Sequence, residues 1–185
     1  MRESSITIWA LFDFGQNFWE VQLPEEMATA DDVKKLCRFL LCKNVIVAPQ
    51  DKVKKLLEKL EINQYIICNS APSGLKRGHY IAVVKSKVNK LLVFDPLASP
   101  LTLKCFEKIF GDYDELYFVK KAVQDDMSNL CSLFVAGFLE AFKNNKIIPY
   151  FKKFKKRNLK QNDAIIYQHL KKILKKKQKL ANAKN

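Results

Sequence analysis

Four polar side chains in this sequence, His79, Asp95, Gln124 and Cys131, are of the types that acyl transfer requires. A cysteine thiolate is a nucleophile, and an imidazole beside it can accept its proton and return it to a leaving group. A carboxylate fixes the imidazole tautomer and stabilises the protonated ring. A side-chain amide can donate a hydrogen bond to an oxyanion, together with the backbone N–H of the cysteine. These groups perform that chemistry only if the elements that carry them bring them to one place.

Cys131 lies at the start of a predicted helix over 129–143. This helix is expected to be buried on a broad face, because apolar residues recur there at helical spacing: Leu130, Leu133, Phe134, Gly137, Phe138 and Ala141. The residues expected to cap its N-terminus are Asp125, Asp126, Ser128 and Asn129. Cys131 then falls in the first turn, where free N–H groups and the helix dipole favour a thiolate. Taken alone, a cysteine in an apolar helix is more often a small buried hydrophobe.

His79 and Asp95 flank a predicted β-hairpin. Two apolar runs, 80–84 and 91–94, are separated by a polar stretch that predicts a loop of about three to five residues. A register in which facing residue numbers sum to about 174–176 allows His79 to oppose Asp95, with Cβ atoms roughly 4.5–5.5 Å apart. The simpler alternatives are a strand histidine, a carboxylate that caps the turn at Pro96, and, at Gln124, an ordinary strand-end amide.

The other elements complete an α+β pattern. The sequence predicts helices over 30–43, 50–61 and 100–111, strands over 45–48, 64–68 and 115–123, and one or two basic helices over 146–181. We expect a central mixed or antiparallel sheet that carries His79 and Asp95, packed against a buried helix with Cys131 at its N-terminus. Residues 1–145 form the expected body, with the site-bearing core at 78–142, and 146–185 form a basic extension packed on the same domain. The aromatic residues before position 30 indicate packing on the body or on a partner.

The five cysteines favour neither a zinc site nor a disulfide framework, because their spacing is irregular, no CxxC occurs and the chain has only two histidines. Four of them are expected to be structural core residues, the usual fate of free cysteine: Cys37, Cys42, Cys68 and Cys105. No uncharged apolar run approaches 18 residues, so no transmembrane helix is predicted. The N-terminus lacks the pattern of a secretory signal, and we expect a protein that is not secreted and stays in a reducing compartment.

Positive charge is concentrated at the C-terminal end. Residues 143–185 hold fifteen Lys and Arg and one acid, Asp163, and so carry the full formal net charge of +14. One account is a solvated helix that docks through Ile166, Leu170, Ile173 and Leu174. The other is binding to a polyanion, expected to be DNA, through counterion release, with a membrane surface as the less favoured partner. The candidate DNA contacts are Lys152, Lys153, Lys155, Lys156, Arg157, Lys171, Lys172, Lys175, Lys176 and Lys177.

The ordered set His79, Asp95, Gln124 and Cys131 resembles the adenovirus protease (adenain) family of cysteine peptidases, which shares its fold type with the ubiquitin-like-protein proteases. The stretch VQ…S..C.LF...FL.AF is the closest match, and the seven-residue interval from Gln124 to Cys131 agrees with the family. The phrase VFDP matches the family's strand-end acid followed by proline, and an aromatic residue, Tyr80, follows the histidine. The resemblance covers about 78–142.

The resemblance implies that Cys131 is the nucleophile, His79 the general base, Asp95 the orienting carboxylate and Gln124 an oxyanion donor. It implies an endopeptidase of a DNA virus or virus-like mobile element, which cleaves capsid or core precursors near small residues during virion maturation. DNA and an activating peptide are the implied cofactors. The implied location is the virion and the nucleus or cytoplasm of the host cell, and a monomer is expected.

Two departures from the family pattern fall beside the nucleophile. Ser132 replaces the glycine that usually follows it, and Asp125-Asp126-Met127 replaces a stretch with glycine and proline. One rival function is a protease of the same clan acting on ubiquitin or SUMO-type modifiers, whose cysteine usually lies between aspartate and glycine. Here the neighbours are Leu130 and Ser132, which disfavours it. The second rival is an inactive, basic nucleic-acid-binding protein.

Overall fold

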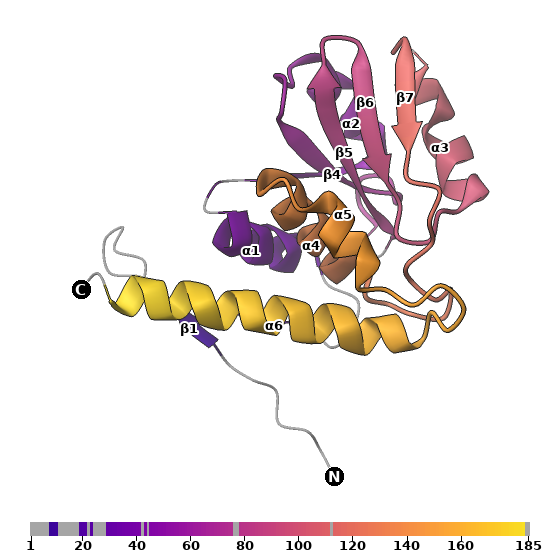
Figure 1. The fold of residues 1–185 in the computed structure, drawn as a ribbon. Coiled ribbons are helices and arrows are strands. Elements are labelled where there is room, and N and C mark those ends of the chain that lie inside the picture. Colours follow the sequence, from indigo (N-terminus) through magenta and orange to yellow (C-terminus); the bar gives the residue numbers. More distant parts are fainter. Residues whose placement is uncertain are drawn as a thin grey trace.

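The protein has an α+β fold built on a five-stranded mixed sheet, as seen in a computed structural model (Figure 1). The structure describes residues 8–10, 19–21, 23, 29–41, 43, 45–75, 78–111 and 113–183. Its strands are β1 (Ile8–Ala10), β2 (Trp19–Val21), β3 (Ile46–Pro49), β4 (Tyr65–Asn69), β5 (Tyr80–Lys87), β6 (Lys90–Phe94) and β7 (Glu115–Phe118). Its helices are α1 (Ala30–Leu41), α2 (Gln50–Glu58), α3 (Pro100–Phe110), α4 (Cys131–Lys143), α5 (Ile147–Lys152) and α6 (Gln161–Asn182).

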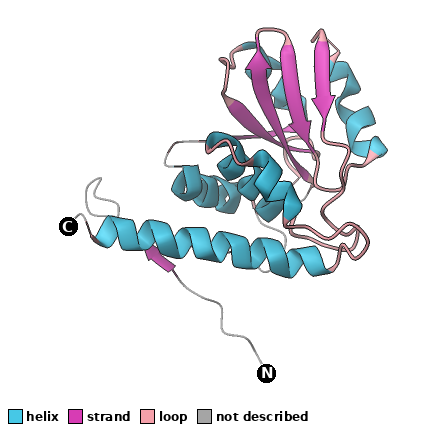
Figure 2. Cartoon of the chain, in the orientation of Figure 1, coloured by secondary structure: helices cyan, strands magenta, loops and turns pink. Residues whose placement is uncertain are grey.

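The sheet has the strand order β3-β4-β5-β6-β7, with β4, β5 and β6 antiparallel and a parallel strand at each edge. Successive side chains of a strand point to opposite faces of the sheet. The wholly apolar start of β5 therefore contributes side chains to two hydrophobic cores, one on each face. Tyr80, Ala82 and Val84 pack with α1, α4 and α6, whereas Ile81 and Val83 pack with α2 and α3. Helices therefore cover both faces (Figure 2).

Helix α4 lies at the centre of the larger core. Ten of its residues are buried, because β5, α1, α5 and α6 all contact it. Phe138 stacks on Phe94 of β6 with ring centroids 4.4 Å apart. Gly137 permits close approach of α6, since a Cβ there would lie 2.9 Å from Ile166 Cδ1. This packing holds the first residue of α4 in a fixed place relative to the sheet.

The basic C-terminal segment belongs to the same core, which agrees with the docked-helix account. Ile166, Leu170 and Leu174 of α6 are fully buried, and Ile173 is partly buried against them. Phe154 is buried, and both Phe151 and Tyr167 pack against this core, so the aromatic residues among the lysines are core residues. The candidate DNA contacts are exposed, except for Lys171 and Lys177, which are half-buried.

Most predicted elements occur within one to three residues of their expected bounds, with two clear differences. The hairpin loop between β5 and β6 has two residues, Val88 and Asn89, instead of three to five. The strand expected over 115–123 ends at Phe118. Its partner β6 stops just before Asp95-Pro96, and proline has no N–H with which to extend the ladder.

The first 29 residues contribute a two-stranded antiparallel ribbon, β1 with β2, that the sequence did not predict. β1 contacts α6. Trp9 belongs to β1 and Trp19 to β2, whereas Phe12, Phe14 and Phe18 lie outside the described residues. The expected packing of these aromatic side chains stays a prediction.

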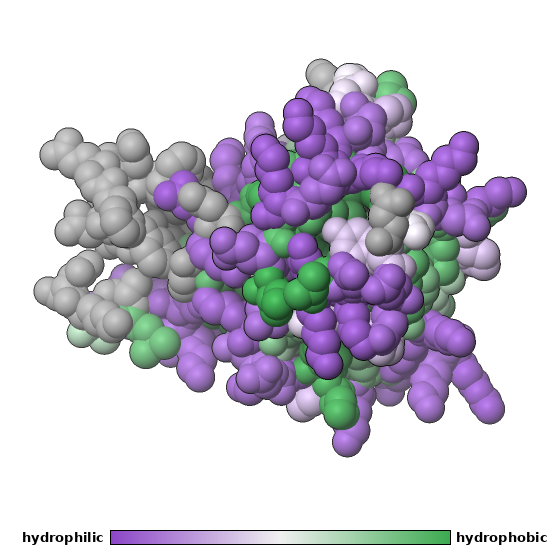
Figure 3. Space-filling view, turned by 90° about the horizontal axis from the view of Figure 1, so that it is seen from above, coloured by the Kyte–Doolittle hydropathy of each residue, from purple (hydrophilic) through white to green (hydrophobic). Residues whose placement is uncertain are grey.

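The face of the molecule shown in Figure 3 is largely hydrophilic, with small hydrophobic areas between the hydrophilic residues. No helix in the described parts of the chain is both long and apolar enough to span a bilayer.

Candidate active site

His79 is placed directly before β5 by its pairing with the end of β4. The His79 amide donates to Ser70 Oγ at 2.8 Å, and the Ser70 amide donates to the His79 carbonyl at 2.8 Å. Gly78 lets the chain pass close to this end of β4, because a Cβ there would lie 1.9 Å from Asn69 Oδ1 and 2.7 Å from the Ala71 nitrogen. Only glycine fits this approach, and it places the next residue, His79, at the start of the central strand β5.

Asp95 follows β6 and is held by a tight turn. Its Oδ1 accepts from the Leu97 amide at 2.9 Å and its Oδ2 from the Ser99 amide at 3.0 Å. His79 Nε2 lies 2.6 Å from Asp95 Oδ1. Burial of Asp95, which is 3% exposed, would raise its pKa, but the bonds from His79 and the two amides outweigh burial and lower the pKa overall. Asp95 is therefore a buried carboxylate that both caps a turn and binds the imidazole.

His79 and Asp95 meet diagonally across the hairpin. The register pairs Ala82 with Phe94 and Val83 with Val93. Continued by one residue, it places Asp95 opposite Ile81, two positions away from His79. The sum of facing residue numbers lies within the predicted range of about 174–176, but it is not the value at which His79 directly opposes Asp95. Both side chains still point to one face, because residues two positions apart on a strand share a face. The imidazole spans the diagonal distance.

Cys131 is the first residue of α4 and is 4% exposed. The expected side-chain cap is absent, since the N-cap position is Leu130 and no side chain bonds to the first turn. Two of the polar side chains before it accept hydrogen bonds from nearby backbone amides instead: Asp125 Oδ1 accepts from the Met127 amide, and Ser128 Oγ accepts from the Leu130 amide. The first N–H groups of a helix have no partner within the helix, so an uncapped start is suited to accept an anion.

His79 and Cys131 interact electrostatically. Burial alone would lower the pKa of His79, but hydrogen bonds and charge interactions with Asp95 and Cys131 raise it from 6.5 to about 9. Because Nε2 is bonded to Asp95, Nδ1 is the ring nitrogen that remains for the thiol. An imidazole with so high a pKa carries a proton at neutral pH, which it can donate.

Gln124 is buried beside this group. Its backbone amide donates to the Pro96 carbonyl at 3.1 Å, which ties it to the residue after Asp95. Its side-chain Nε2 donates to the Ser128 carbonyl at 2.8 Å, while its Oε1 is buried without a hydrogen-bond partner. The amide nitrogen carries two hydrogens, so one remains for an oxyanion.

Ser132, the residue that departs from the family pattern, is fully buried, and its Oγ has no hydrogen-bond partner. A buried hydroxyl without a partner costs stability. Its role at the position after the cysteine has no explanation in the packing.

The other cysteines separate into two kinds. Cys37 and Cys68 are fully buried, and burial raises the pKa of both thiols, that of Cys37 to about 12. They are inert core residues, as predicted. Cys105 is exposed, so the core prediction is wrong for it. Phe106 faces the core, and the preceding residue lies about 100° away around the helix. Cys42 lies outside the described residues.

The sequence did not point to several residues that position the site. Ser70 and Asn69 were part of a turn-rich stretch, and only the pair Gly78-His79 carried a signal, a glycine directly before a histidine. In the part of the chain that the structure describes, no group of three or more His, Cys, Asp or Glu could hold a metal.

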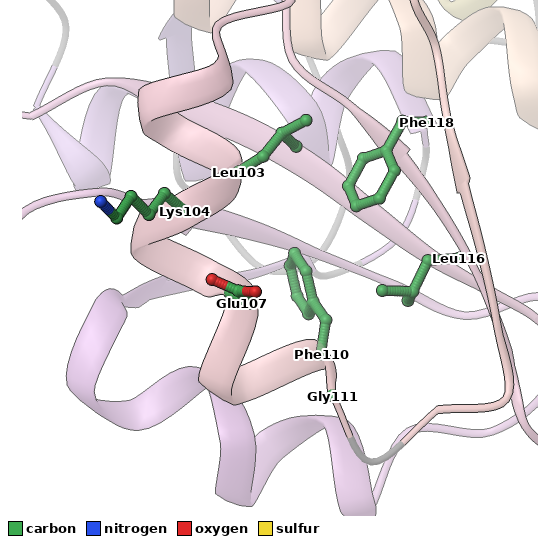
Figure 4. A pocket seen from close by; sticks show the side chains of 7 residues that line it. All are labelled: Leu103, Lys104, Glu107, Phe110, Gly111, Leu116 and Phe118. Carbon is green, nitrogen blue, oxygen red and sulfur yellow. The ribbon is translucent and has the colours of Figure 1, made fainter.

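A separate apolar hollow of about 360 Å³ lies between α3 and β7 (Figure 4). Leu103, Phe110, Leu116 and Phe118 surround it. None of the candidate catalytic residues lines it, so it plays no part in the chemistry of Cys131.

Comparison of the sequence with protein-family models and with curated proteins finds no match.

Proposed function

We propose that this chain is a cysteine peptidase with Cys131 as its nucleophile. The observation that carries the proposal is the connected set Asp95–His79–Cys131: a 2.6 Å contact between carboxylate and imidazole, and an imidazole whose pKa is raised to about 9 by both partners. The uncapped start of α4 adds backbone N–H groups at the nucleophile. A structural cysteine in a helix requires none of these features.

In the proposed reaction the Cys131 thiolate attacks the carbonyl carbon of a peptide bond and forms a C–S bond. The α4 N-terminus and the Gln124 amide donate hydrogen bonds to the oxyanion. The His79 imidazolium protonates the leaving amine as the C–N bond breaks. The imidazole then takes a proton from water as the water oxygen attacks the thioester carbonyl. The C–S bond breaks, the carboxylic acid product leaves, and the Cys131 thiolate and His79 imidazolium are restored.

The resemblance to the adenovirus protease family supports a particular class of substrate. On this basis we propose an endopeptidase that cleaves precursors of virion proteins, with the fold type of that family. DNA as a cofactor is supported by the positive charge of 143–185 and by the exposed lysines of α5 and α6. An activating peptide rests on the resemblance alone.

The test of the nucleophile is competitive alkylation by iodoacetamide, read by mass spectrometry at each cysteine. Cys105 is exposed and Cys131 is 4% exposed, so accessibility alone predicts that Cys105 reacts first. We expect the reverse order at pH 7, and we expect His79→Ala to slow alkylation of Cys131 without changing that of Cys105. Faster reaction of Cys105, with no effect of His79→Ala on Cys131, would refute the proposal.

Peptidase specificity needs a second assay. We expect the chain to cleave unfolded protein substrates and Cys131→Ala to abolish that cleavage. If the chain instead releases a fluorophore only from the C-terminus of ubiquitin or SUMO, the modifier protease is the correct function.

A further inference from the structure

We infer that Asn162 of α6 is a positioning residue for the oxyanion donor Gln124, so that the basic helix is part of the catalytic apparatus. This inference rests on the proposed function. The segment that links the two is the oxyanion loop, defined here as residues 123–130, which runs from the end of the sheet region to the start of α4. No residue of α6 belongs to the group that the sequence assigned to catalysis.

Asn162 is fully buried and uses both ends of its side-chain amide. Its Nδ2 donates to the Val123 carbonyl at 2.8 Å and to the Lys155 carbonyl at 3.1 Å, while its Oδ1 accepts from the Lys155 amide at 2.8 Å. Val123 immediately precedes Gln124. The amide of Asn162 therefore fixes the peptide group through which the chain enters Gln124.

A second contact holds the other end of the same loop. Ser128 Oγ donates to Asp163 Oδ1 at 2.9 Å, and the Ser128 carbonyl accepts the Gln124 side-chain amide. Consecutive residues at the start of α6 thus bond to the residue before Gln124 and to the residue that orients its side chain. On the opposite side, the Pro96 carbonyl accepts the amides of Val123 and Gln124.

The first turn of α6 can hold the loop in place because the helix itself is fixed. Ile166, Leu170 and Leu174 anchor it in the core against α4, whose first residue is Cys131. The packing of α6 on α4 therefore holds the oxyanion loop in a fixed position relative to Cys131. Displacement of an oxyanion donor by about 1 Å is enough to slow acyl transfer by about 100-fold.

The experiment compares two reactions of Cys131 in the full chain. Acylation by p-nitrophenyl acetate passes through a tetrahedral oxyanion: the thiolate forms a C–S bond, and p-nitrophenolate leaves. Alkylation by iodoacetamide displaces iodide directly and forms no oxyanion. Both reactions need the thiolate, but only the first needs Gln124 and the loop. A Cys131→Ala variant supplies the background rate.

The test variant is Asn162→Asp, which keeps the side-chain size and the acceptor for the Lys155 amide but loses the donor to the Val123 and Lys155 carbonyls. We expect the acylation burst to slow about 10- to 100-fold, while the alkylation rate stays within about twofold of the wild type. Ser128→Ala, at a half-buried position, removes the second contact and is expected to act in the same direction. If Asn162→Asp fails to fold, the two reaction rates are compared in Ser128→Ala instead.

The matched control is Tyr150→Phe, which removes a buried hydrogen bond of 2.7 Å to the Phe134 carbonyl of α4 and leaves the loop untouched. It is expected to lower stability and to change neither rate. The inference is overturned if Asn162→Asp slows both reactions equally, or slows acylation no more than Tyr150→Phe does. If the wild type shows no His79-dependent reaction of Cys131 at all, the proposed function itself fails, and the inference fails with it.

Discussion

At the scale of single residues, the chain contains two histidines in opposite environments. His79 interacts with a buried carboxylate and a thiol, which together raise its pKa to about 9. His169 of α6 lies beside the ring of Tyr150, and burial together with Lys153 and Lys172 lowers its pKa to about 4. The same side chain is thus held charged at one position and neutral at the other.

We expect NMR of ring-labelled histidine to show one titration near pH 9 and one near pH 4, with none near the ordinary value of 6.5. His79→Ala should remove the titration near pH 9, which assigns that signal to His79 and the remaining one to His169. Asp95→Asn should move the His79 titration to lower pH, because it removes the carboxylate that stabilises the imidazolium. Two titrations near 6.5 would contradict the site geometry.

The two histidines also make opposite contributions to folding stability. His169 takes up its proton more readily in the unfolded chain, so its contribution is present above pH 6.5 and is lost as pH falls toward 4. The contribution of His79 is present below pH 6.5 and is lost as pH rises through about 9. We expect His169→Gln to reduce the loss of stability between pH 6.5 and 4, as measured by urea denaturation at several pH values.

Ser132 leads to a stability prediction of its own. Since its buried Oγ has no partner, Ser132→Ala should raise the free energy of unfolding by about 1 kcal/mol. The alkylation rate of Cys131 should not change. A loss of stability on this substitution would show that the hydroxyl has a partner in solution, such as water.

At the scale of elements, the candidate site lies where three elements begin or end: the start of β5, the end of β6 and the start of α4. Residue types at these ends are unusual for their elements. Gly78 precedes a strand, Asp95 caps a turn while it binds an imidazole, and α4 begins without a side-chain cap.

Substitutions at Gly78 and Gly74 distinguish displacement of His79 from a loss of stability alone. Gly78→Ala would bring a Cβ to within 1.9 Å of Asn69 Oδ1, and this overpacking should cost about 1–3 kcal/mol. Gly74→Ala meets no atom within 4 Å, but its φ of +93° makes a side chain cost about 1 kcal/mol. We expect only Gly78→Ala to slow alkylation of Cys131, because only that change displaces His79. Equal rates for both variants would contradict the assigned role of Gly78.

At the scale of the whole molecule, the basic C-terminal segment is both core and charged surface. Because Ile166, Leu170 and Leu174 are fully buried, removing the segment would expose the core and unfold the chain. Truncation is therefore a poor test of DNA binding. Substitution of exposed lysines is the appropriate one.

We expect Lys172, Lys175 and Lys176, changed together to Gln, to lower DNA affinity. The slope of log affinity against log salt should fall by about 0.9 for each phosphate that the variant no longer neutralises. The matched control changes three exposed lysines on the other side of the sheet: Lys52, Lys55 and Lys59. The charge change is the same for both sets. If both sets reduce the slope equally, α6 is not a specific DNA-binding surface.

How much the sequence could predict depended on the range of the interactions involved. Most strands and helices after residue 29 were predicted within a few residues, since hydrophobic periodicity is a local property. The ribbon of β1 and β2 was not predicted, and β7 is shorter than expected. The sequence predicted that His79 and Asp95 lie close together, but not that they meet diagonally. A two-residue change of register leaves the pattern of inward and outward residues intact, so the sequence pattern does not fix the exact pairing. The side-chain cap expected from Asp125 to Asn129 is absent, and two of these side chains, Asp125 and Ser128, have hydrogen-bond partners elsewhere.

The sequence by itself therefore determined the order of the elements, the apolar faces and the residue types available for acyl transfer. The tertiary structure alone decided that α6 holds the loop before Cys131. The bond from Asn162 to Val123 joins residues 39 positions apart. Asn162 is one of six asparagines in residues 143–185, and no local sequence pattern distinguishes it. Such a bond forms only after the apolar face of α6 has packed on α4, so packing selects which polar groups meet.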